Sequence, residues 1–387
     1  MTAPEIILSL FQERFSKSVK MYFAPGSINL LGEHVDYNDG LTLPAAIDMG
    51  IWLAVYKNNT NRVNIIASDI SEEVCSFILP TPSKEEGWKN LVVTLLQILH
   101  KKQFVIDGFD CVFGGNIPSN IGLGEQAAFI SGLLFAINEL MQLQIPIQEL
   151  ATIAIEVEQN IEKKSYCGIN TYATIFGKAN HCLHFDCLNK AYETISITTD
   201  EYQWVLIDAG IEAKDFATLN ERRIEAFEAL SFFTTVNKKI KSYRFVNHAI
   251  VEQFSYMMTD EIYNKAMFIT QEIERVKEGA ILLQQSDLIA FGKLMYKSHS
   301  QLSELYEVSC SELDFLVAEA KMQYDVIGAK MMGNSCTLNL IHKENIQTVI
   351  NQMTNAFENV YKKTPTVHFI TLSDGVKEVN PSEYYYA

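Results

Sequence analysis

The spacing of hydrophobic and polar positions changes several times along the chain, and each change predicts an element. Helical spacing occurs at residues 4–19, 90–100, 125–143 and 147–163, and it dominates from about residue 220. Strand patterns occur at residues 51–56, 63–67, 109–113, 181–187, 204–209, 337–341 and 366–370. We expect residues 51–56 to pair with residues 63–67. Because strands and helices do not alternate regularly, the pattern favours an α+β fold over a doubly wound sheet.

Length predicts two domains. The chain has 387 residues, and single cores stop growing at roughly 250–300 residues. A hydrophobic content of 48% is that of an ordinary globular protein. The sequence has no internal repeat and no Pro- or Gly-rich linker to mark a boundary. We place the division near residue 190, which gives an N-terminal domain at residues 1–190 and a C-terminal domain at residues 191–387.

The net charge of the chain argues against two classes of binding partner. The formal net charge is −16, which argues against nucleic acid and anionic membrane surfaces because both attract clustered Lys and Arg. No apolar run reaches the roughly 18 residues of a membrane span, and the first 20 residues lack a signal-peptide pattern. The seven cysteines are odd in number and scattered, which suits a reducing compartment. We therefore expect a cytoplasmic protein.

A dense polar motif stands out near the N-terminus. Residues 22–40 read YFAPGSINLLGEHVDYNDG and bring three polar side chains into four positions, namely Glu33, His34 and Asp36. Flanking glycines allow tight turns, so these side chains can converge on the hydroxyl groups of one sugar. Such a site discriminates sharply between sugars, because a missing hydroxyl leaves buried polar groups unpaired. The alternative from residue type alone is a polar turn with its tip at residues 38–40.

The extended run at residues 24–37 resembles the galactokinase signature, whose usual form is A-P-G-R-V-N-L-I-G-E-H-T-D-Y. In that family the Glu, His and Asp of the motif bind the sugar. The resemblance therefore implies a sugar ligand held by Glu33, His34 and Asp36, with Asp39 assisting. Ser27 stands where the signature carries its arginine.

A second motif lies at residues 116–129, NIPSNIGLGEQAAF. It resembles the phosphate-binding loop of the wider GHMP kinase family, which includes homoserine kinase and mevalonate kinase, with the pattern P-x-x-x-G-L-S-S-S-A. The loop implied for the nucleotide comprises Gly122, Leu123, Gly124, Glu125 and Gln126, the last three in place of the serines. Free amides at a helix N-terminus attract phosphate, whereas a glutamate there repels it.

Two residues near this loop have competing interpretations. Glu125 is typical of a first helical turn, where an acidic side chain satisfies the helix terminus itself, and we favour that reading. Trp88 offers an aromatic face to an adenine ring, but a lone tryptophan more often fills a core or a domain interface.

A third motif covers residues 167–187, CGINTYATIFGKANHCLHFDC. It resembles the galactokinase segment C-G-I-M-D-Q-F, followed by a Gly-Lys turn and a strand ending in Asp-Cys. The family's catalytic aspartate falls on Thr171, with Asn170 beside it, and neither side chain acts as a base near neutral pH. Glu158 lies about where the family places an acidic magnesium ligand, and a surface carboxylate on a helix is the alternative.

The same stretch contains five residues of metal-ligand type, namely His181, Cys182, His184, Asp186 and Cys187. Side chains alternate along a strand, so the first and last of them face away from the other three. Zinc motifs usually bring paired ligands from two turns. We expect a half-buried strand here instead of a metal site.

Two later segments depart further from the family. Residues 328–341, GAKMMGNSCTLNLI, resemble the motif M-T-G-x-G-F-G-G-C only at Met331 and Gly333, which suggests a reshaped or closed nucleotide pocket. Residues 220–223 keep the family's Asn-Glu-Arg-Arg, but Leu219 replaces the neighbouring tyrosine, so sugar binding is expected to weaken as well.

The resemblance runs from residue 23 to about residue 341 in the family's order. It implies a two-domain GHMP-kinase fold, with an N-terminal α+β domain, a C-terminal ferredoxin-like domain and the active site between them. It also implies ATP and Mg²⁺ as cofactors. Phosphoryl transfer needs a base and cations around the phosphate, and the signature arginine, the aspartate and the serine loop are all replaced.

These replacements favour a catalytically impaired, galactokinase-like protein that binds a galactose-type sugar, or a protein partner, without phosphorylating it. One alternative is an active ATP-dependent galactokinase that uses non-standard residues. The other is an interaction protein with no small-molecule ligand.

Overall fold

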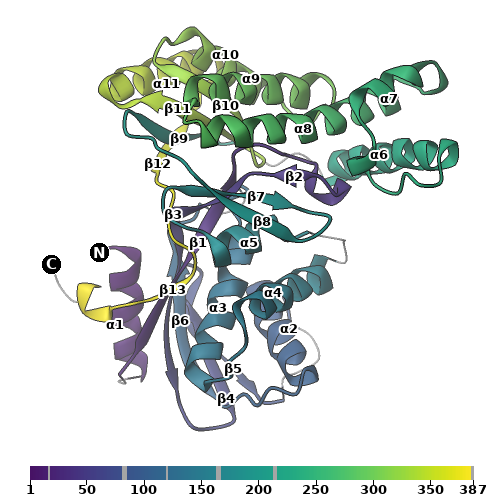
Figure 1. Cartoon of the computed structure of the whole chain (residues 1–387). Helices are drawn as coiled ribbons and strands as arrows, with labels where there is room; N and C mark the ends of the chain where they lie inside the picture. The colour runs from purple at the N-terminus through teal and green to yellow at the C-terminus, as the bar shows by residue number, and fades with distance from the viewer. Residues whose placement is uncertain (16–17, 81–84, 119–120, 163–166, 212–215, 385–387) are drawn as a thin grey trace.

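The structure is a computed structural model that describes residues 1–387 apart from 16–17, 81–84, 119–120, 163–166, 212–215 and 385–387. Residues 119 and 120 of the predicted phosphate loop therefore lie outside the described part, as does the last residue of the helix predicted at 147–163. Helices and sheets are mixed in both halves of the molecule (Figure 1), which confirms the α+β prediction.

A six-stranded sheet forms the centre of the N-terminal half, in the order β13-β1-β3-β6-β4-β5. Its strands are β1 (Lys20–Asn29), β3 (Pro44–Lys57), β4 (Arg62–Ala67), β5 (Ser71–Ile78), β6 (Phe109–Gly115) and β13 (Lys377–Val379). The central strands β1, β3 and β6 are buried on both faces, which their long apolar runs require.

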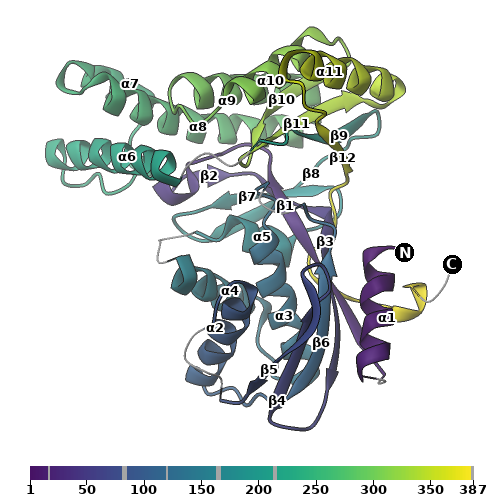
Figure 2. The same cartoon turned by 180° about the vertical axis from the view of Figure 1, so that it is seen from behind.

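Helices cover both faces of this sheet (Figures 1 and 2). On one face lies α1 (Ala3–Phe15), whose Leu8 and Phe11 pack against Ile66 and Val112 of the sheet. The other face is covered by α2 (Trp88–Lys101), α3 (Glu125–Met141), α4 (Ile147–Glu162) and α5 (Ile169–Phe176). The helices predicted from spacing near these positions are confirmed.

The predicted pairing of residues 51–56 with residues 63–67 is wrong. Strand β6 lies between β3 and β4, antiparallel to the first and parallel to the second. Every residue of β6 before Gly115 is buried, and such a strand needs a neighbour on each edge. The segment that connects β3 to β4 therefore spans the width of β6. Gly108, just before β6, donates its backbone N–H to Thr60 O in this segment at 2.7 Å.

The sequence pattern missed β1, β5 and β13 of the six-stranded sheet and three further strands. β8 (Ala191–Ser196) is largely exposed and carries no apolar run. It completes a three-stranded sheet, β2-β7-β8, with β2 (Leu41–Thr42) and β7 (His181–Asp186). β10 (Val326–Met332) contains a lysine among its apolar residues, which hides the strand pattern.

The C-terminal half has an antiparallel sheet in the order β10-β11-β9-β12. Its other strands are β9 (Tyr202–Asp208), β11 (Cys336–His342) and β12 (Thr366–Ile370). α9 (Leu288–Glu304) and α10 (Ser311–Met322) contact this sheet, α11 (Ile346–Tyr361) packs against α10, and α8 (Asp260–Gln284) packs against α9. α6 (Phe216–Val236) and α7 (His248–Gln253) project to one side (Figure 1).

The chain crosses between its two halves more than once. β8 pairs with β7, and β13 returns to pair with β1. The short 3₁₀-helix Pro381–Tyr384 that follows β13 contacts α1 (Figure 1). Among the described residues, no helix has both the length and the apolar character needed to cross a bilayer.

Helix α9 approaches strand β10 through two glycines, and this contact places the strand that later supports the functional site. A Cβ atom on Gly292 would overlap the Ile327 carbonyl oxygen, and one on Gly328 would lie 2.5 Å from Gly292 Cα. Only glycine allows backbones this close together.

We expect Gly292→Ala to lower the free energy of unfolding by about 1–3 kcal/mol or more, because the added methyl group must push α9 away from β10. Chemical denaturation measures the change. Lys293→Ala, at the exposed neighbouring position of the same helix, is the control and should change stability by less than about 0.5 kcal/mol. Equal stability of the Gly292→Ala variant and the wild type would contradict the packing described here.

Candidate functional site

The loop between β1 and β2 carries the predicted sugar-binding residues and folds back on itself. Gly32, His34 and Asp39 have φ angles of 98°, 60° and 58°, in the left-handed region. Gly40 N–H donates to Val35 O at 2.8 Å, and the Asn38 side-chain amide donates to His34 O at 3.0 Å. These contacts fix the loop without a ligand, so its side chains are held in place before binding.

Glu272 of α8 binds the backbone of this loop. Its buried carboxylate accepts the Gly32 N–H at 2.8 Å and the Ser298 hydroxyl at 2.9 Å, and it pairs with Arg275. A side chain at position 32 would meet the Leu41 carbonyl oxygen at 2.6 Å. Glycine is therefore required at the point where the C-terminal half contacts the loop.

Glu33 is held by Lys330 of β10. The Lys330 side chain is completely buried, and its ammonium lies 2.9 Å from Glu33 Oε1. The same ammonium donates to the backbone oxygens of Asn29 and Met331, both at 3.1 Å. Three acceptors thus satisfy the three donors of the lysine, and the glutamate is oriented by a residue from the other end of the chain.

His34 lies against two tyrosines. Its Nδ1 is 3.1 Å from the Tyr37 hydroxyl, which is 2.8 Å from the Tyr306 hydroxyl. Burial and, to a lesser extent, the positive charges of Arg223 and Lys330 together lower the pKa of His34 from 6.5 to about 4. The ring is therefore neutral near pH 7, with one nitrogen able to donate and one able to accept.

Asp36 lies close to the same group of charges. Burial raises the pKa of Asp36 from 3.8 to about 6; the Arg223 guanidinium opposes this shift and the Glu33 carboxylate adds to it. Arg223 also lies over the Tyr37 ring, 4.4 Å from its centroid. Asp39 is half-buried at the end of the short 3₁₀-helix Asp36–Asn38. The structure thus brings Glu33, His34 and Asp36 into one polar cluster, in which Arg223 and Lys330 lie close by.

Three motifs distant in sequence meet at the end of β1. The Ser27 hydroxyl donates to Asn170 Oδ1 at 3.1 Å, and the Ser27 N–H donates to Leu123 O at 2.9 Å. A Cβ atom on Gly124 would lie 2.6 Å from Ser27 Oγ and 3.1 Å from Asn170 Cβ. The signature strand, the phosphate-type loop and helix α5 are therefore in direct contact.

The phosphate-type loop is also in contact with the turn that follows β10. Gly122 and Gly333 pack together so closely that a Cβ on Gly122 would lie 2.7 Å from Gly333 Cα. Both glycines have left-handed φ angles, 89° and 59°. Leu123 is buried, so its side chain belongs to the core. The turn after β10 therefore rests directly on the loop.

The start of α3 carries negative charge. Partial burial raises the pKa of Glu125, and the neighbouring Asp69 carboxylate adds to the shift. Asp69 is itself held at this place by the Gly115 N–H, which donates to it at 2.6 Å. Gln126 is exposed. Two carboxylates thus stand where the helix N-terminus would otherwise attract an anion.

Thr171 and Glu158 form a buried pair. The Thr171 hydroxyl donates to Glu158 Oε2 at 2.6 Å, and both residues are buried. The helical surface carboxylate considered for Glu158 is therefore not what the structure shows. Glu158 is an acceptor inside the protein, beside the position that carries the family's aspartate.

Trp88 begins α2 and packs against the core. Its ring meets Phe113 edge-on, with 5.3 Å between centroids, and it is half-buried. Among the described residues, no three side chains of the His, Cys, Asp and Glu types converge in a way that would hold a metal ion.

Sequence reasoning missed four contributors to this site: Asp69, Glu272, Tyr306 and Lys330. Lys330 left a signal, since a lysine inside the apolar strand VIGAKMM needs a buried partner. The other three lie in segments without a motif, and only the fold brings them to the site.

Comparison with known proteins finds three family matches in order along the chain. Residues 9–57 match the galactokinase galactose-binding signature, residues 90–178 the GHMP kinases N terminal domain, and residues 280–359 the GHMP kinases C terminal. A galactokinase of Clostridium tetani is 29% identical over 374 residues, covering 94% of each chain. A galactokinase of Roseiflexus sp. is 28% identical over 361 residues, covering 92% of each chain.

Solved structures agree with these matches. Lactococcus lactis galactokinase complexed with galactose superposes with a TM-score of 0.91 at 26% identity, covering 96% of this chain and 98% of that one. The mevalonate kinase of Methanococcus jannaschii has a TM-score of 0.66 at 16% identity, covering 92% of this chain and 99% of that one. The second likeness concerns the fold alone.

The raised pKa of Asp36 generates a stability prediction. Its carboxyl holds a proton up to about pH 6 in the folded state but only up to 3.8 when unfolded, so ionising it costs the folded protein roughly 3 kcal/mol at neutral pH. We expect Asp36→Asn to raise the free energy of unfolding by up to this amount at about pH 7.5, and by much less at about pH 4. Urea denaturation at both pH values measures the difference.

Asp39→Asn is the matched control, because it makes the same substitution in the same loop. It should change stability by less than about 0.5 kcal/mol at either pH. Destabilisation by Asp36→Asn at the higher pH would contradict this prediction, because it would show that the ionised Asp36 carboxylate stabilises the folded protein.

Proposed function

Because the chain belongs to the galactokinase branch of the GHMP kinase family, we propose that it binds a galactose-type sugar and is impaired in phosphorylating it. The observation that carries the proposal is a contrast within one site. The loop between β1 and β2, called the sugar loop from here on, keeps the family's Glu, His and Asp, and buried residues support it. The positions of the family's arginine and aspartate hold Ser27 and Thr171 instead, and each of these two is hydrogen-bonded to a neighbouring side chain.

The chemistry of the pocket suits a neutral, hydroxyl-rich ligand. His34 is uncharged near pH 7 and Asp36 is ionised above about pH 6. Glu33 is oriented by Lys330 at 2.9 Å. Carboxylates accept hydrogen bonds from sugar hydroxyls, and an imidazole can both donate and accept. A pocket organised in this way would reject a sugar that leaves one of these groups unpaired.

The nucleotide side fits its expected ligand poorly. ATP phosphates would lie along residues 122–126, where Gly333 packs against Gly122 and the Glu125 carboxylate stands beside Asp69. Carboxylates are the ligands Mg²⁺ takes, but Glu158 already accepts the Thr171 hydroxyl. The residues present therefore favour a closed, negatively charged loop over one that cradles a triphosphate.

Phosphoryl transfer would lack its usual stabilisers. A threonine hydroxyl does not act as a base near neutral pH, and a serine carries no charge to neutralise the phosphate. Loss of one such stabiliser costs about 2.7–4 kcal/mol, and losses within one unit are not additive. The proposed protein therefore holds the sugar without useful turnover.

One observation favours a second candidate, an active kinase with a displaced base. The Glu158 carboxylate lies 2.6 Å from the Thr171 hydroxyl, so a carboxylate remains next to the family's catalytic position. In this candidate Glu158 would accept the proton of the sugar hydroxyl in place of the missing aspartate.

Separate calorimetric titrations with galactose and with Mg-ATP test the proposal. We expect saturable heat with galactose, none with Mg-ATP, and no ADP release in a coupled assay. His34→Ala should weaken galactose binding at least tenfold, since a lost hydrogen-bonding group in a polar site costs about 1.4 kcal/mol or more. His100→Ala, at an exposed histidine on α2, should leave the binding unchanged.

Other outcomes are equally informative. If the wild type releases ADP and Glu158→Gln abolishes this release, the active kinase is correct and the sugar-binding protein without turnover is not. Absence of any heat with either ligand would favour an interaction protein.

A further inference from the structure

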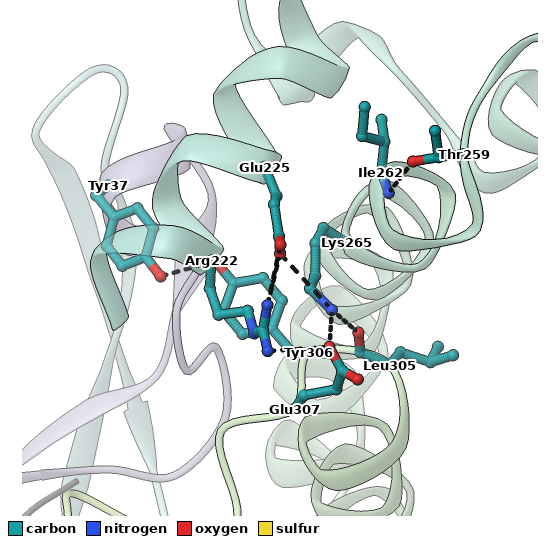
Figure 3. Close-up of polar contacts among 9 residues, drawn as sticks. All are labelled: Tyr37, Arg222, Glu225, Thr259, Ile262, Lys265, Leu305, Tyr306 and Glu307. Atoms are coloured by element: carbon teal, nitrogen blue, oxygen red, sulfur yellow. Dashed lines mark hydrogen bonds and ion pairs between the residues drawn. The ribbon is translucent and has the colours of Figure 1, made fainter. Parts of the chain in front are cut away.

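Four charged side chains form a closed cluster behind the sugar loop (Figure 3). This charged quartet comprises Arg222, Glu225, Lys265 and Glu307. Arg222 lies 3.0 Å from Glu225 and 3.2 Å from Glu307, and Lys265 lies 2.6 Å from Glu307 and 3.9 Å from Glu225. Each cation therefore touches both anions, and the charges sum to zero.

The quartet joins three separate parts of the C-terminal half. Arg222 and Glu225 lie on α6, Lys265 lies on α8, and Glu307 lies in the turn after α9 (Figure 3). The Lys265 side chain is fully buried, whereas Glu307 is half-exposed. Burying a charged group seldom adds net stability, but it does fix geometry, because each charge tolerates only a narrow set of partner positions.

The turn that carries Glu307 also carries Tyr306. Lys265 donates to the Leu305 carbonyl oxygen at 2.7 Å and to Glu307, so it grips the residues on both sides of the tyrosine. Glu307 has a φ angle of 58°, a left-handed conformation that residues other than glycine adopt only at an energetic cost. The lysine thus holds the turn in a shape it would not favour alone.

Tyr306 packs against His34 of the sugar loop. Its ring is fully buried, with its centroid 5.3 Å from that of His34 and 4.6 Å from that of Phe268. Its hydroxyl lies 2.8 Å from the Tyr37 hydroxyl, which in turn contacts His34. A shift of this turn would therefore move both aromatic groups that face the histidine.

The other end of the quartet reaches the same loop through α6. Arg222 is followed by Arg223, whose guanidinium lies over the Tyr37 ring at 4.4 Å and influences the pKa of Asp36. Fixing Arg222 between two carboxylates therefore fixes the helix turn that presents Arg223. Tyr306 and Arg223, which contact the sugar loop from two different elements, are therefore both positioned by the charged quartet.

We propose that the charged quartet is a positioning device for sugar recognition, with Lys265 and Glu307 as positioning residues that act through Tyr306 and Arg223. The inference rests on the proposed sugar-binding function and adds to it a set of residues outside the pocket that set its affinity. None of the four needs to touch the sugar.

The test compares galactose dissociation constants by calorimetry. Glu307→Gln removes one charge at a half-exposed position, so the variant should fold, and we expect it to bind galactose at least about fivefold more weakly. Lys265→Met should weaken binding by at least as much. Glu304→Gln and Lys297→Met are the matched controls at exposed positions on α9 and should stay within about twofold of the wild type.

A double-mutant cycle separates positioning from general loss of stability. If Glu307 acts through Tyr306, then Glu307→Gln should weaken binding much less in a Tyr306→Phe background than in the wild type. Unchanged affinity of Glu307→Gln, or fold-changes that simply multiply, would overturn the proposal.

A readout without sugar keeps this inference distinct from the proposed function. In the unliganded protein, the NMR signals of the His34 ring, assigned with His34→Ala, should shift in Lys265→Met but not in Lys297→Met. If the wild type binds no galactose, the proposed function fails, and the His34 signals still test the positioning. His34 signals identical in both lysine variants would overturn it.

Discussion

The ion pair between Lys330 and Glu33 is the contact on which the shape of the loop between β1 and β2 depends. A fully buried ammonium is tolerated only when its donors are satisfied, and here one carboxylate and two backbone oxygens satisfy them. Both the strand that carries Lys330 and the helix that carries Glu272 belong to the C-terminal half. The signature motif of the N-terminal half therefore acquires its shape only when the two halves are packed together.

Electrostatic compensation distinguishes the two sides of the site. Around the loop between β1 and β2, Lys330 pairs with Glu33 and Arg275 pairs with Glu272, whereas Arg223 only partly offsets the burial that raises the pKa of Asp36. On the nucleotide side, Glu125 faces another carboxylate, Asp69. A triphosphate bound at this loop would add further negative charge beside these two carboxylates and would be repelled by them.

Sequence reasoning reached the parts of the site that have a local pattern or a family motif. It named Ser27, Gly124 and Asn170 in three separate motifs, and the structure shows these residues in contact. It failed where a strand's neighbours are chosen by burial, as with β6 inserted between β3 and β4. It also missed Tyr306, because nothing in its local sequence marks it, and its contact with Tyr37 spans 269 positions.

The replaced catalytic positions form a linked set. Thr171 lies 2.6 Å from Glu158, and Ser27 is bonded to Asn170, so each replacement fits the next. An aspartate restored at position 171 would bring a second carboxylate to Glu158, with repulsion of roughly 4 kcal/mol at about 4 Å and an effective dielectric near 20. The family's arginine, which would supply positive charge near this point, is a serine here. An aspartate at position 171 alone would therefore add repulsion without the family's arginine to offset it, so these positions depend on one another.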